Sequence, residues 1–340
     1  MLDQDWKIFI GESNEWNKFV ESNNGQFRQL YEWGNYKESL GWKVLRLVYE
    51  KDKKIISSTQ IFYRKKFFLS MVYMPGGING DFDYVSKKLI SKIKNLIGAN
   101  VIYLRADFIN QFKDKDQILL KKNKWSRSKF EMDSRRFFEV DLCLTNDEIL
   151  SNTSQKWRYN FKRSLKNNIV CKEETVNKNF FFTYIHNQLS KEKNMRNLFS
   201  DREVEALIKE LNKKLIISTA WQGNKLIGVR SIILVGKKAW HLNSAVNLEG
   251  RKTLAGYKLL MHMIDVCKKR DVSYYNLGGV QEKLFPGPYQ FKTSFGKKSS
   301  YQILGEWEFS NFLFMKFILN FAMQFYIKSS LLMSKIIKNL

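Results

Sequence analysis

Lys292 lies in the stretch of this chain whose composition points most directly to chemistry. Three segments, 275–280, 285–296 and 304–308, surround it and hold two of the three prolines and five of the 18 glycines behind an apolar, strand-like start. Glycine and proline at this density are typical of backbone that approaches a ligand closely. We therefore expect Gly278 and Gly279 to contact a substrate near Lys292. The alternative is a surface loop whose lysine points to water.

Arg105 and Asp107 form a second candidate, at the end of an apolar run, 101–105, that is predicted to be a strand. A carboxylate there could accept a proton from an attacking amine or hold that amine. A guanidinium there could meet a carboxylate or a phosphate. The alternative for this pair is a surface ion pair.

A third candidate is a predicted helix with basic side chains at helical spacing and with Trp157 and Tyr159 between them. Its cations are Lys156, Arg158, Lys162, Arg163 and Lys166. Such a helix could bind the backbone of an RNA acceptor arm, or it could be a solvated helix face.

Two halves of the chain repeat one order of predicted elements. Apolar runs between charged turns indicate strands over 43–79, helical spacing follows over 84–96, and 101–105 returns to strand. The second half has strands at 215–220, 226–235, 239–244 and 273–277, with a helix from about Thr253 to Arg270. This repeat predicts two α/β domains, at 1–145 and 146–309. The boundary lies where Thr145-Asn146-Asp147-Glu148 is a helix start.

Residues 310–340 form a third segment of different composition. A polar line of Lys316, Asn320, Gln324 and Lys328 runs at four-residue spacing along an otherwise apolar helix. A narrow basic stripe on a broad apolar face is typical of a helix in a bilayer interface, and the stripe argues against a helix that spans the bilayer. A helix that returns to pack on the first domain is the alternative, and the two are compatible.

The composition is that of a globular protein with a large positive charge. Hydrophobic content of 44% and aromatic content of 15% exclude wholesale disorder. The net charge of +25 predicts an anionic partner such as RNA, a pyrophosphate-linked substrate or an acidic membrane surface, although an AT-rich genome would also raise the lysine content.

Cys143, Cys171 and Cys267 lie far apart and outside any metal spacing. We therefore expect buried thiols, a reducing compartment and no metal site. No amino-terminal signal peptide is visible, because Asp3 and Asp5 interrupt the start before an apolar core forms. These features predict a cytoplasmic protein.

Several blocks of this sequence together resemble the FemABX peptidoglycan-bridge aminoacyltransferases. That family has an aromatic-Asp-x-Gly-Gly strand, a Gly-x-Tyr-x-Phe-Lys-x-x-Phe-Gly turn and a Gly-Glu-aromatic strand. The similar segments here are Tyr275-Asn276-Leu277-Gly278-Gly279, residues 287–296 and Gly305-Glu306-Trp307. Residues 29–42 resemble the family's opening helix, Tyr73-Met74-Pro75-Gly76-Gly77 its first-domain loop, and 155–164 a further block. The resemblance spans roughly residues 26–309.

The resemblance implies tandem acetyltransferase-like (GNAT) domains with a cleft between them, the first on the acceptor side and the second on the donor side. Lys292 matches the family's catalytic lysine, which would stabilise a tetrahedral oxyanion and the departing ester oxygen. Phe291 would fix that lysine and keep water out, and Tyr289 would contact substrate. Lys37, which follows Glu32-Trp33-Gly34, matches a lysine that binds the acceptor's phosphates; without the resemblance it would be a solvated side chain.

The acyl donor is the open part of this interpretation. Coenzyme-A-dependent relatives carry Arg/Gln-x-x-Gly-x-Gly/Ala before a helix, where backbone N–H groups hold the pyrophosphate. Here Leu254, in 251–256, replaces the first glycine, which favours aminoacyl-tRNA over acyl-CoA as donor.

We therefore expect an aminoacyl-tRNA-dependent transferase that needs no cofactor. Its acceptor would be an amine of a lipid-linked or nucleotide-linked cell-envelope precursor, and its place the inner membrane face, as a peripheral protein. One alternative is an acyl-CoA-dependent N-acyltransferase that acts on an envelope sugar. Another is a non-enzymatic RNA-binding or membrane scaffold.

Overall fold

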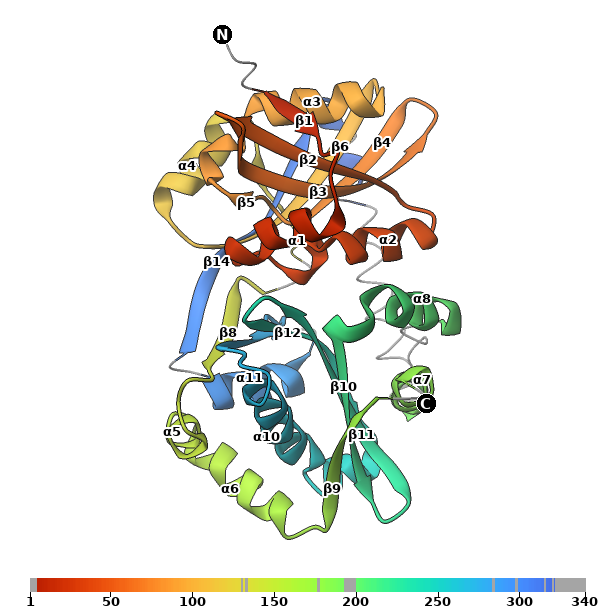
Figure 1. The fold of residues 1–340 in the computed structure, drawn as a ribbon, viewed down its shortest axis with the longest axis vertical. Coiled ribbons are helices and arrows are strands. Elements are labelled where there is room, and N and C mark those ends of the chain that lie inside the picture. The colour runs from red at the N-terminus through yellow and green to blue at the C-terminus, as the bar shows by residue number, and fades with distance from the viewer. Residues whose placement is uncertain are drawn as a thin grey trace. The chain divides into compact units, whose positions relative to one another are not determined.

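The computed structural model consists of two compact units, Met1–Arg135 with Gln302–Leu340, and Arg136–Tyr301 (Figure 1). The described residues are 5–129, 131, 134–175, 178–192, 200–282, 285–296, 299–314, 316–319 and 321. The domain ranges 1–145, 146–309 and 310–340 remain a prediction. The strand at the end of the second range, 300–310, pairs with a strand of the first unit.

The first unit is built on a mixed sheet with strand order β1-β2-β3-β4-β6-β14, to which the short β5 and β7 add at β3 and β14. Its strands are β1 (Trp6–Ile8), β2 (Lys43–Lys51), β3 (Lys54–Lys66), β4 (Leu69–Gly76), β5 (Asn79–Gly80), β6 (Val101–Gln111), β7 (Ser126–Arg127) and β14 (Ser300–Ser310). Its helices are α1 (Ser13–Ser22), η1 (Phe27–Gln29), α2 (Tyr31–Ser39), η2 (Phe82–Tyr84), α3 (Lys87–Ile97) and α4 (Asp114–Lys122). Strands β4 and β6 are parallel, whereas β14 is antiparallel to β6.

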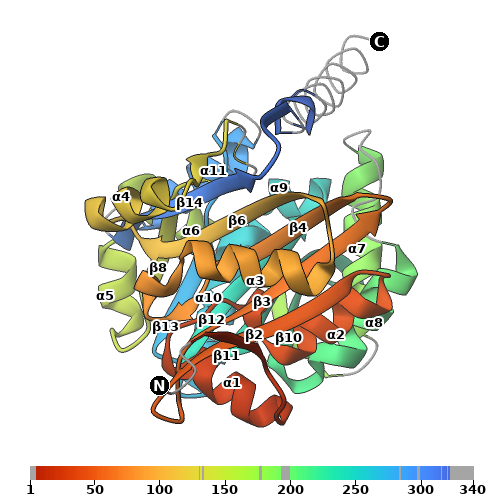
Figure 2. The same cartoon turned by 90° about the horizontal axis from the view of Figure 1, so that it is seen from above.

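One face of this sheet forms the core of the first unit. Side chains alternate between the two faces of a strand, so Ile102, Leu104 and Ala106 of β6 share one face. They belong to a buried apolar cluster that also contains Leu89 and Ile93 of α3. Figure 2 shows α3 in front of the strands, and Figure 1 shows α1 and α2 on the other side of the sheet. The residues between the core positions of β6 therefore face away from α3.

The second unit repeats this plan with strand order β8-β13-β12-β11-β10-β9. Its strands are β8 (Arg136–Asp141), β9 (Ile169–Glu174), β10 (Leu215–Gln222), β11 (Lys225–Val235), β12 (Lys238–Val246) and β13 (Tyr274–Gly278). Its helices are α5 (Asn146–Ser151), α6 (Gln155–Leu165), α7 (Lys178–Glu192), α8 (Asp201–Leu211), η3 (Asn212–Lys214), α9 (Leu248–Lys252), α10 (Ala255–Lys268) and α11 (Pro286–Gly296). Strands β12 and β13 are parallel.

The two units contain the same order of elements, β2-β3-β4-α3-β6 in the first and β10-β11-β12-α10-β13 in the second. In each, three strands follow as hairpins, a helix crosses over, and the last strand runs parallel to the third. The predicted tandem α/β fold is confirmed. The predicted helix start is confirmed too, because Thr145 and Glu148 form a capping box at α5.

Two predicted elements differ from those observed. Strand β6 does not end near Arg105 but continues to Gln111, because β4 and β14 pair with it on both sides. The predicted turn around Lys292 is the helix α11. The helix expected from about Thr253 to Arg270 is observed as α10 (Ala255–Lys268), and Leu254, whose φ is +61°, separates it from the short α9 before it.

The carboxy-terminal segment is described only in part. Residues 313–314, 316–319 and 321 are helical, whereas Asn320, Gln324 and Lys328 of the predicted polar line lie outside the described residues. Among the helices of the described residues, none has the length and apolar character needed to cross a membrane.

Candidate functional site

Lys292 lies in the second turn of α11, where its ammonium reaches the end of β13. Its Nζ donates a hydrogen bond to the carbonyl oxygen of Gly279 at 3.0 Å. Gly278 has φ of +70°, and a Cβ added there would lie 3.7 Å from the Lys292 Nζ. Glycine adopts this left-handed backbone conformation without strain, so Gly278 lets the chain turn beneath the Lys292 ammonium. The predicted proximity of Gly278, Gly279 and Lys292 is therefore observed, while their contact with substrate stays a prediction.

Asn276 fixes the backbone that holds Lys292, a role that was not predicted from the sequence. The Gly278 backbone N–H donates to Asn276 Oδ1 at 2.7 Å, and Asn276 Nδ2 donates to Glu139 Oε2 at 3.2 Å and to the Tyr301 hydroxyl at 3.0 Å. Asn276 is fully buried. It occupies the position where the family pattern has Asp. This departure from the pattern is the feature of the sequence that could have indicated the role of Asn276.

Phe291 belongs to an aromatic cluster that joins α11 to α6 and α10. Its ring centroid lies 5.1 Å from that of Tyr257 and 6.1 Å from that of Trp157, and Trp157 also meets Phe295 at 4.7 Å. These contacts fix the helix that carries Lys292, while the role of Phe291 in keeping water from the lysine stays a prediction. Tyr289 lies one turn earlier and is half-buried, and its carbonyl accepts a hydrogen bond from the Thr293 hydroxyl at 2.9 Å. Its role in binding substrate stays a prediction.

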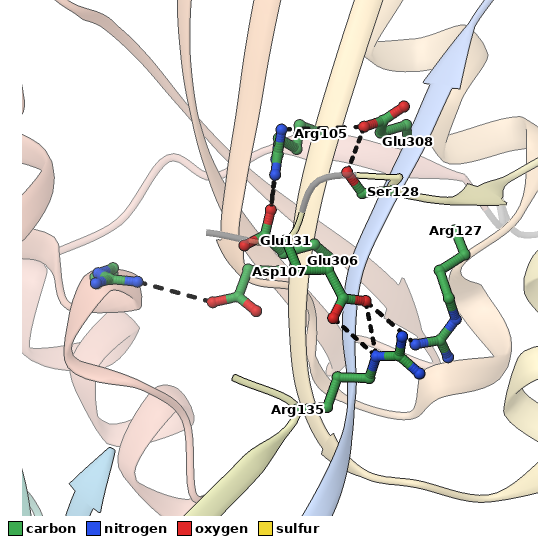
Figure 3. A network of polar contacts seen from close by, with 9 residues as sticks. Arg105, Asp107, Arg127, Ser128, Glu131, Arg135, Glu306 and Glu308 are labelled. Atoms are coloured by element: carbon green, nitrogen blue, oxygen red, sulfur yellow. Dashed lines mark hydrogen bonds and ion pairs between the residues drawn. The ribbon is translucent and has the colours of Figure 1, made fainter. Parts of the chain in front are cut away.

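In the first unit, four charged residues lie on the sheet face opposite the α3 core. Asp107 of β6 is paired with Glu306 of β14 in the strand register, and Arg105 with Glu308. Alternation places all four on one face, and Figure 3 shows them gathered there. All four are buried. The predicted Arg105 and Asp107 are thus brought together with two glutamates of a segment 200 residues later in the sequence.

Arg105 is bound by these glutamates. Its Nε donates to Glu306 Oε2 at 2.6 Å, its Nη2 contacts the same oxygen, and its Nη1 lies 4.0 Å from Glu308 Oε1. Burial lowers the pKa of Arg105, but the attraction and hydrogen bond of Glu306, together with the charges of Tyr103 and Glu308, outweigh it and raise that pKa overall. A guanidinium held in this way fixes β6 to β14. Arg105 therefore forms a buried ion pair with Glu306, and not the surface ion pair that was the alternative in the sequence analysis. Binding of a substrate anion by Arg105 stays a prediction.

Asp107 is paired with Arg28, whose Nη1 lies 3.7 Å from Asp107 Oδ2. Arg28 is in η1, and the next residue, Gln29, fastens η1 to the sheet. The Gln29 Nε2 donates to the Gln60 carbonyl at 3.0 Å and to the Pro75 carbonyl, and its Oε1 accepts from the Gln60 N–H at 2.7 Å. This buried amide therefore positions the partner of Asp107, a role that the sequence analysis did not assign.

Glu308 also connects the sheet to the carboxy-terminal segment. Its Oε1 accepts from the Ser128 hydroxyl at 2.5 Å, and its Oε2 lies 3.8 Å from the Lys316 Nζ. Burial and the charge of Glu308 raise the pKa of Tyr103 on the same face. Lys316, expected on the membrane-facing stripe, thus forms an ion pair inside the first unit. Figure 3 also shows Glu131 paired with Arg127 and Arg135.

Lys37 is partly buried at the end of α2, and its Nζ lies 4.8 Å from the ring centroid of Tyr36 and 5.4 Å from that of Trp33. Cation–π contacts of this kind hold the ammonium in place. Gly34 in the same helix is required sterically, because a Cβ there would lie 2.4 Å from both Arg46 Nη2 and Gln60 Oε1. Lys37 is therefore not an extended solvated side chain, and its binding of phosphate stays a prediction.

The basic helix is α6, and its side chains divide into two groups. Arg158 folds back on the preceding helix, where its Nη1 donates to the carbonyls of Leu150 at 3.3 Å, Ser151 at 3.2 Å and Thr153. Trp157 is in the core. The exposed basic and aromatic side chains of the helix and its C-cap are Lys156, Tyr159, Lys162, Arg163 and Lys166. This exposed group could meet RNA, whereas Arg158 and Trp157 contribute to packing; RNA binding by α6 stays a prediction.

The cysteines and the metal-ligand types add no further site. Burial raises the pKa of Cys171 to about 11 and that of Cys267 to about 12, which keeps both thiols protonated near neutral pH. Cys143 is exposed, so the expectation that all three thiols are buried is wrong. Within the described ranges, no three His, Cys, Asp or Glu side chains are arranged to hold a metal ion.

Comparison with known proteins gives a family match and several similar folds. The sequence matches the FemAB family over residues 12–106 and 166–310. No curated protein matches it. The crystal structure of FemX has a TM-score of 0.73 at 14% identity, covering 89% of this chain and 96% of that one. The carboxy-terminal domain of a putative lysylphosphatidylglycerol synthetase from Agrobacterium fabrum has a TM-score of 0.55 at 9% identity, covering 87% and 91%. A tandem GNAT protein from the clavulanic acid biosynthesis pathway has a TM-score of 0.52 at 9% identity, covering 90% and 98%.

Proposed function

This chain belongs to the FemAB family, and from that premise we propose that it transfers an amino acid from aminoacyl-tRNA to an amine of a peptidoglycan-type precursor. The family supports an acyltransferase in general terms. The donor, the acceptor and the roles of the residues are the proposed part.

The observation that carries the proposal is the position of Lys292. Its ammonium is fixed by the Gly279 carbonyl at 3.0 Å and by the aromatic cluster around Phe291. When an amine attacks the aminoacyl ester, a C–N bond forms, the carbonyl oxygen gains negative charge, and the C–O bond to the ribose then breaks. A fixed cation beside these oxygens stabilises the transition state more than the ground state. Over the whole transfer the amine gives off one proton and the released ribose oxygen takes one up, so the step balances.

The first unit would contribute acceptor binding. Lys37, held over two aromatic rings, is positioned to meet phosphate of the nucleotide-linked or lipid-linked precursor. Asp107, which Arg28 holds in place, is the proposed acceptor of the amine's proton. Arg105 supports Asp107 indirectly, because its pair with Glu306 fixes β6 against β14.

Substitution of Lys292 tests this proposal. Lys292→Ala should lower turnover by roughly 100-fold, about 2.7 kcal/mol, because the developing negative charge loses its cation. The affinity for the acceptor should change little, and Lys292→Arg should restore part of the rate. The matched control is Lys258→Ala, since the Lys258 ammonium also donates to a carbonyl, that of Ile169 at 2.6 Å, elsewhere in the second unit. Wild-type turnover in Lys292→Ala would contradict the proposal.

The second candidate is acyl-CoA-dependent N-acylation, and one observation favours it. The sequence argument against a pyrophosphate-binding turn depended on Leu254 in place of glycine. Leu254 nevertheless adopts the left-handed conformation, with φ 61° and ψ 30°, directly before α10. A left-handed residue therefore occurs at this position without the glycine, which removes the sequence argument against acyl-CoA as the donor.

We propose that a face of the first unit contacts the inner membrane surface. The β3–β4 turn and the carboxy-terminal segment both flank the start of β6: the Val101 N–H donates to the Phe68 carbonyl at 3.0 Å and the Ile102 N–H to Asn311 Oδ1 at 2.8 Å. The exposed apolar side chains there are Phe67, Phe68, Phe312, Leu313, Phe314, Phe317, Ile318 and Phe321.

These side chains, which we call the apolar face, suit a lipid surface. Exposed apolar groups gathered in one place mark contact surfaces, and Lys65 and Lys66 beside them suit anionic headgroups. Phe67 keeps its ring exposed at φ of +53°, a conformation that costs energy for any residue with a Cβ. The anchoring that was expected from Lys316 is thus assigned to aromatic side chains instead.

A further inference from the structure

Arg230 is a buried cation for which the proposed mechanism has no use. It lies in β11, with 5% of its surface exposed. Within the described residues no carboxylate forms an ion pair with it, and its buried Nε has no hydrogen-bond partner there. Removing a guanidinium from water without an opposite charge is costly. A protein that keeps such a group commonly supplies the missing anion with a ligand.

The neighbours of Arg230 are donors or neutral acceptors. Its Nη1 donates to the Tyr275 hydroxyl at 3.2 Å and contacts His241 Nδ1 at 3.4 Å. Since arginine cannot accept a hydrogen bond, the contacted ring nitrogen must be the acceptor, which places the imidazole proton on Nε2. The Tyr275 oxygen likewise accepts from Arg230, so its own hydrogen can be donated elsewhere.

Lys292 belongs to the same surroundings. The Arg230 guanidinium lies 6.0 Å from the ring centroid of Phe291, the residue before Lys292. Burial, followed by the positive charges of Arg230 and Lys292, holds the pKa of His241 well below its usual range, so that the ring is neutral at pH 7. The cluster of Arg230, His241, Tyr275 and Lys292 therefore presents N–H and O–H donors and two positive charges.

The cluster lies where strands β12 and β13 stop pairing with each other. Strands β12 and β13 are paired from Lys238 and Tyr274 to Trp240 and Asn276. Both strands continue past that point, β12 to Val246 and β13 to Gly278. His241 directly follows the last paired residue of β12, and Lys292 is hydrogen-bonded just beyond the end of β13. A ligand held by Lys292 would thus be near the donors of Arg230 and its neighbours.

We propose that Arg230, with Tyr275 and His241, binds an anionic oxygen group of the acyl donor, a phosphate or a carboxylate, beside Lys292. The assignment of this anionic group to the acyl donor rests on the proposed function. That the bound group is an anion follows from the cluster itself, whatever the function. A site of donors and cations would repel the ammonium of an amino acid and attract phosphate or carboxylate oxygens. Two sources fit, the phosphodiester next to the esterified nucleotide of the RNA and an acidic side chain of the transferred amino acid.

Anion binding without acyl transfer tests this site. The full-length protein is titrated with adenosine 5′-monophosphate, inorganic phosphate and acetate at constant ionic strength, by calorimetry and by melting temperature. Arg230→Met should weaken binding of the preferred anion by at least about tenfold, because the charged donor is lost. Arg270→Met, which removes an exposed arginine of the same unit, should leave that affinity unchanged. Tighter binding of the nucleotide identifies the RNA phosphate as source, and tighter binding of acetate identifies the side-chain carboxylate.

Stability distinguishes this role from a structural one. If the site is built for a ligand, Arg230→Met in anion-free buffer should melt at the wild-type temperature or above it, since an uncompensated buried charge is replaced by an apolar side chain. Tyr275→Phe, which keeps the ring and removes one donor, should weaken the anion without unfolding the protein. Anion affinity that is unchanged in both variants would overturn the proposal, and so would a lower melting temperature of Arg230→Met with unchanged affinity. If the protein is the proposed transferase but Arg230 binds no anion, Arg230→Met will leave anion affinity unchanged while Lys292→Ala still lowers turnover. The two proposals can therefore fail separately.

Discussion

At the scale of residues, side chains proposed to act are held by side chains that only position them. Lys292 depends on the Gly279 carbonyl, and that backbone depends on the Asn276 amide. Asp107 depends on Arg28, whose segment Gln29 fastens to two strands. Fixed geometry of this kind is what electrostatic stabilisation of a transition state requires.

Asn276 offers a sharp test of such positioning. Asn276→Asp keeps the acceptor for the Gly278 N–H but places a second carboxylate 3.2 Å from Glu139, where the amide now donates. We expect a loss of about 1–3 kcal/mol in the free energy of unfolding, because a buried donor is lost and like charges meet.

The matched double variant Asn276→Asp with Glu139→Gln removes the repulsion and restores a donor. Its unfolding free energy, measured by urea denaturation, should recover most of that loss. Equal destabilisation in the single and double variants would show that the Asn276–Glu139 contact is not what holds this backbone.

Lys37 is predicted to act on the acceptor alone. Lys37→Met keeps an apolar stem over Trp33 and Tyr36 and removes the charge, so the fold should persist. Acceptor affinity, measured by calorimetry with a nucleotide-linked precursor, should fall by roughly tenfold, as expected for a lost charge-assisted phosphate contact. Affinity for the donor should stay as in the wild type. Unchanged acceptor affinity would remove Lys37 from the site.

At the scale of elements, strand alternation and helix packing explain why distant residues meet. Alternation along β6 and β14 separates core positions from Arg105, Asp107, Glu306 and Glu308. Helix α11 brings Phe291 and Lys292 to β13 because Phe291 and Phe295 pack on Trp157. The helix therefore gives Lys292 a firmer position than the predicted turn would.

The apolar face is the element-scale prediction for membrane contact. Phe67→Ser with Phe68→Ser, and separately Phe312→Ser with Phe314→Ser, should each reduce sedimentation with anionic liposomes severalfold, since aromatic side chains no longer enter the acyl boundary. Ile118→Ser, another exposed apolar side chain of the first unit, is the matched control and should sediment like the wild type. Melting temperatures should stay unchanged because the substituted rings are exposed. Wild-type sedimentation of both double variants would exclude this face as the anchor.

At the scale of the whole molecule, the sequence was sufficient for the fold but only partly for the sites. Repetition of strands and one helix predicted the two α/β units, because hydrophobic periodicity follows the buried faces directly. It could not predict the ion pair between Glu306 and Arg105, since a side-chain contact between residues 201 positions apart depends on how β6 and β14 pair in the tertiary structure. It also missed α11, because glycine and proline at 286–288 indicated a turn while packing of Phe291 and Phe295 favoured a helix.

The central claim concerns the acyl donor, and the consumption of labelled donors tests it most directly. The purified protein is incubated with tRNAs charged with radiolabelled amino acids and, separately, with labelled acetyl-CoA, each with and without a nucleotide-linked peptidoglycan precursor. We predict that label leaves tRNA and appears on the precursor, that acetyl-CoA is not consumed, and that Lys292→Ala slows the transfer by roughly 100-fold. Transfer of the acetyl label to an acceptor, with charged tRNA lost no faster than in buffer, would contradict the account and establish the acyl-CoA alternative.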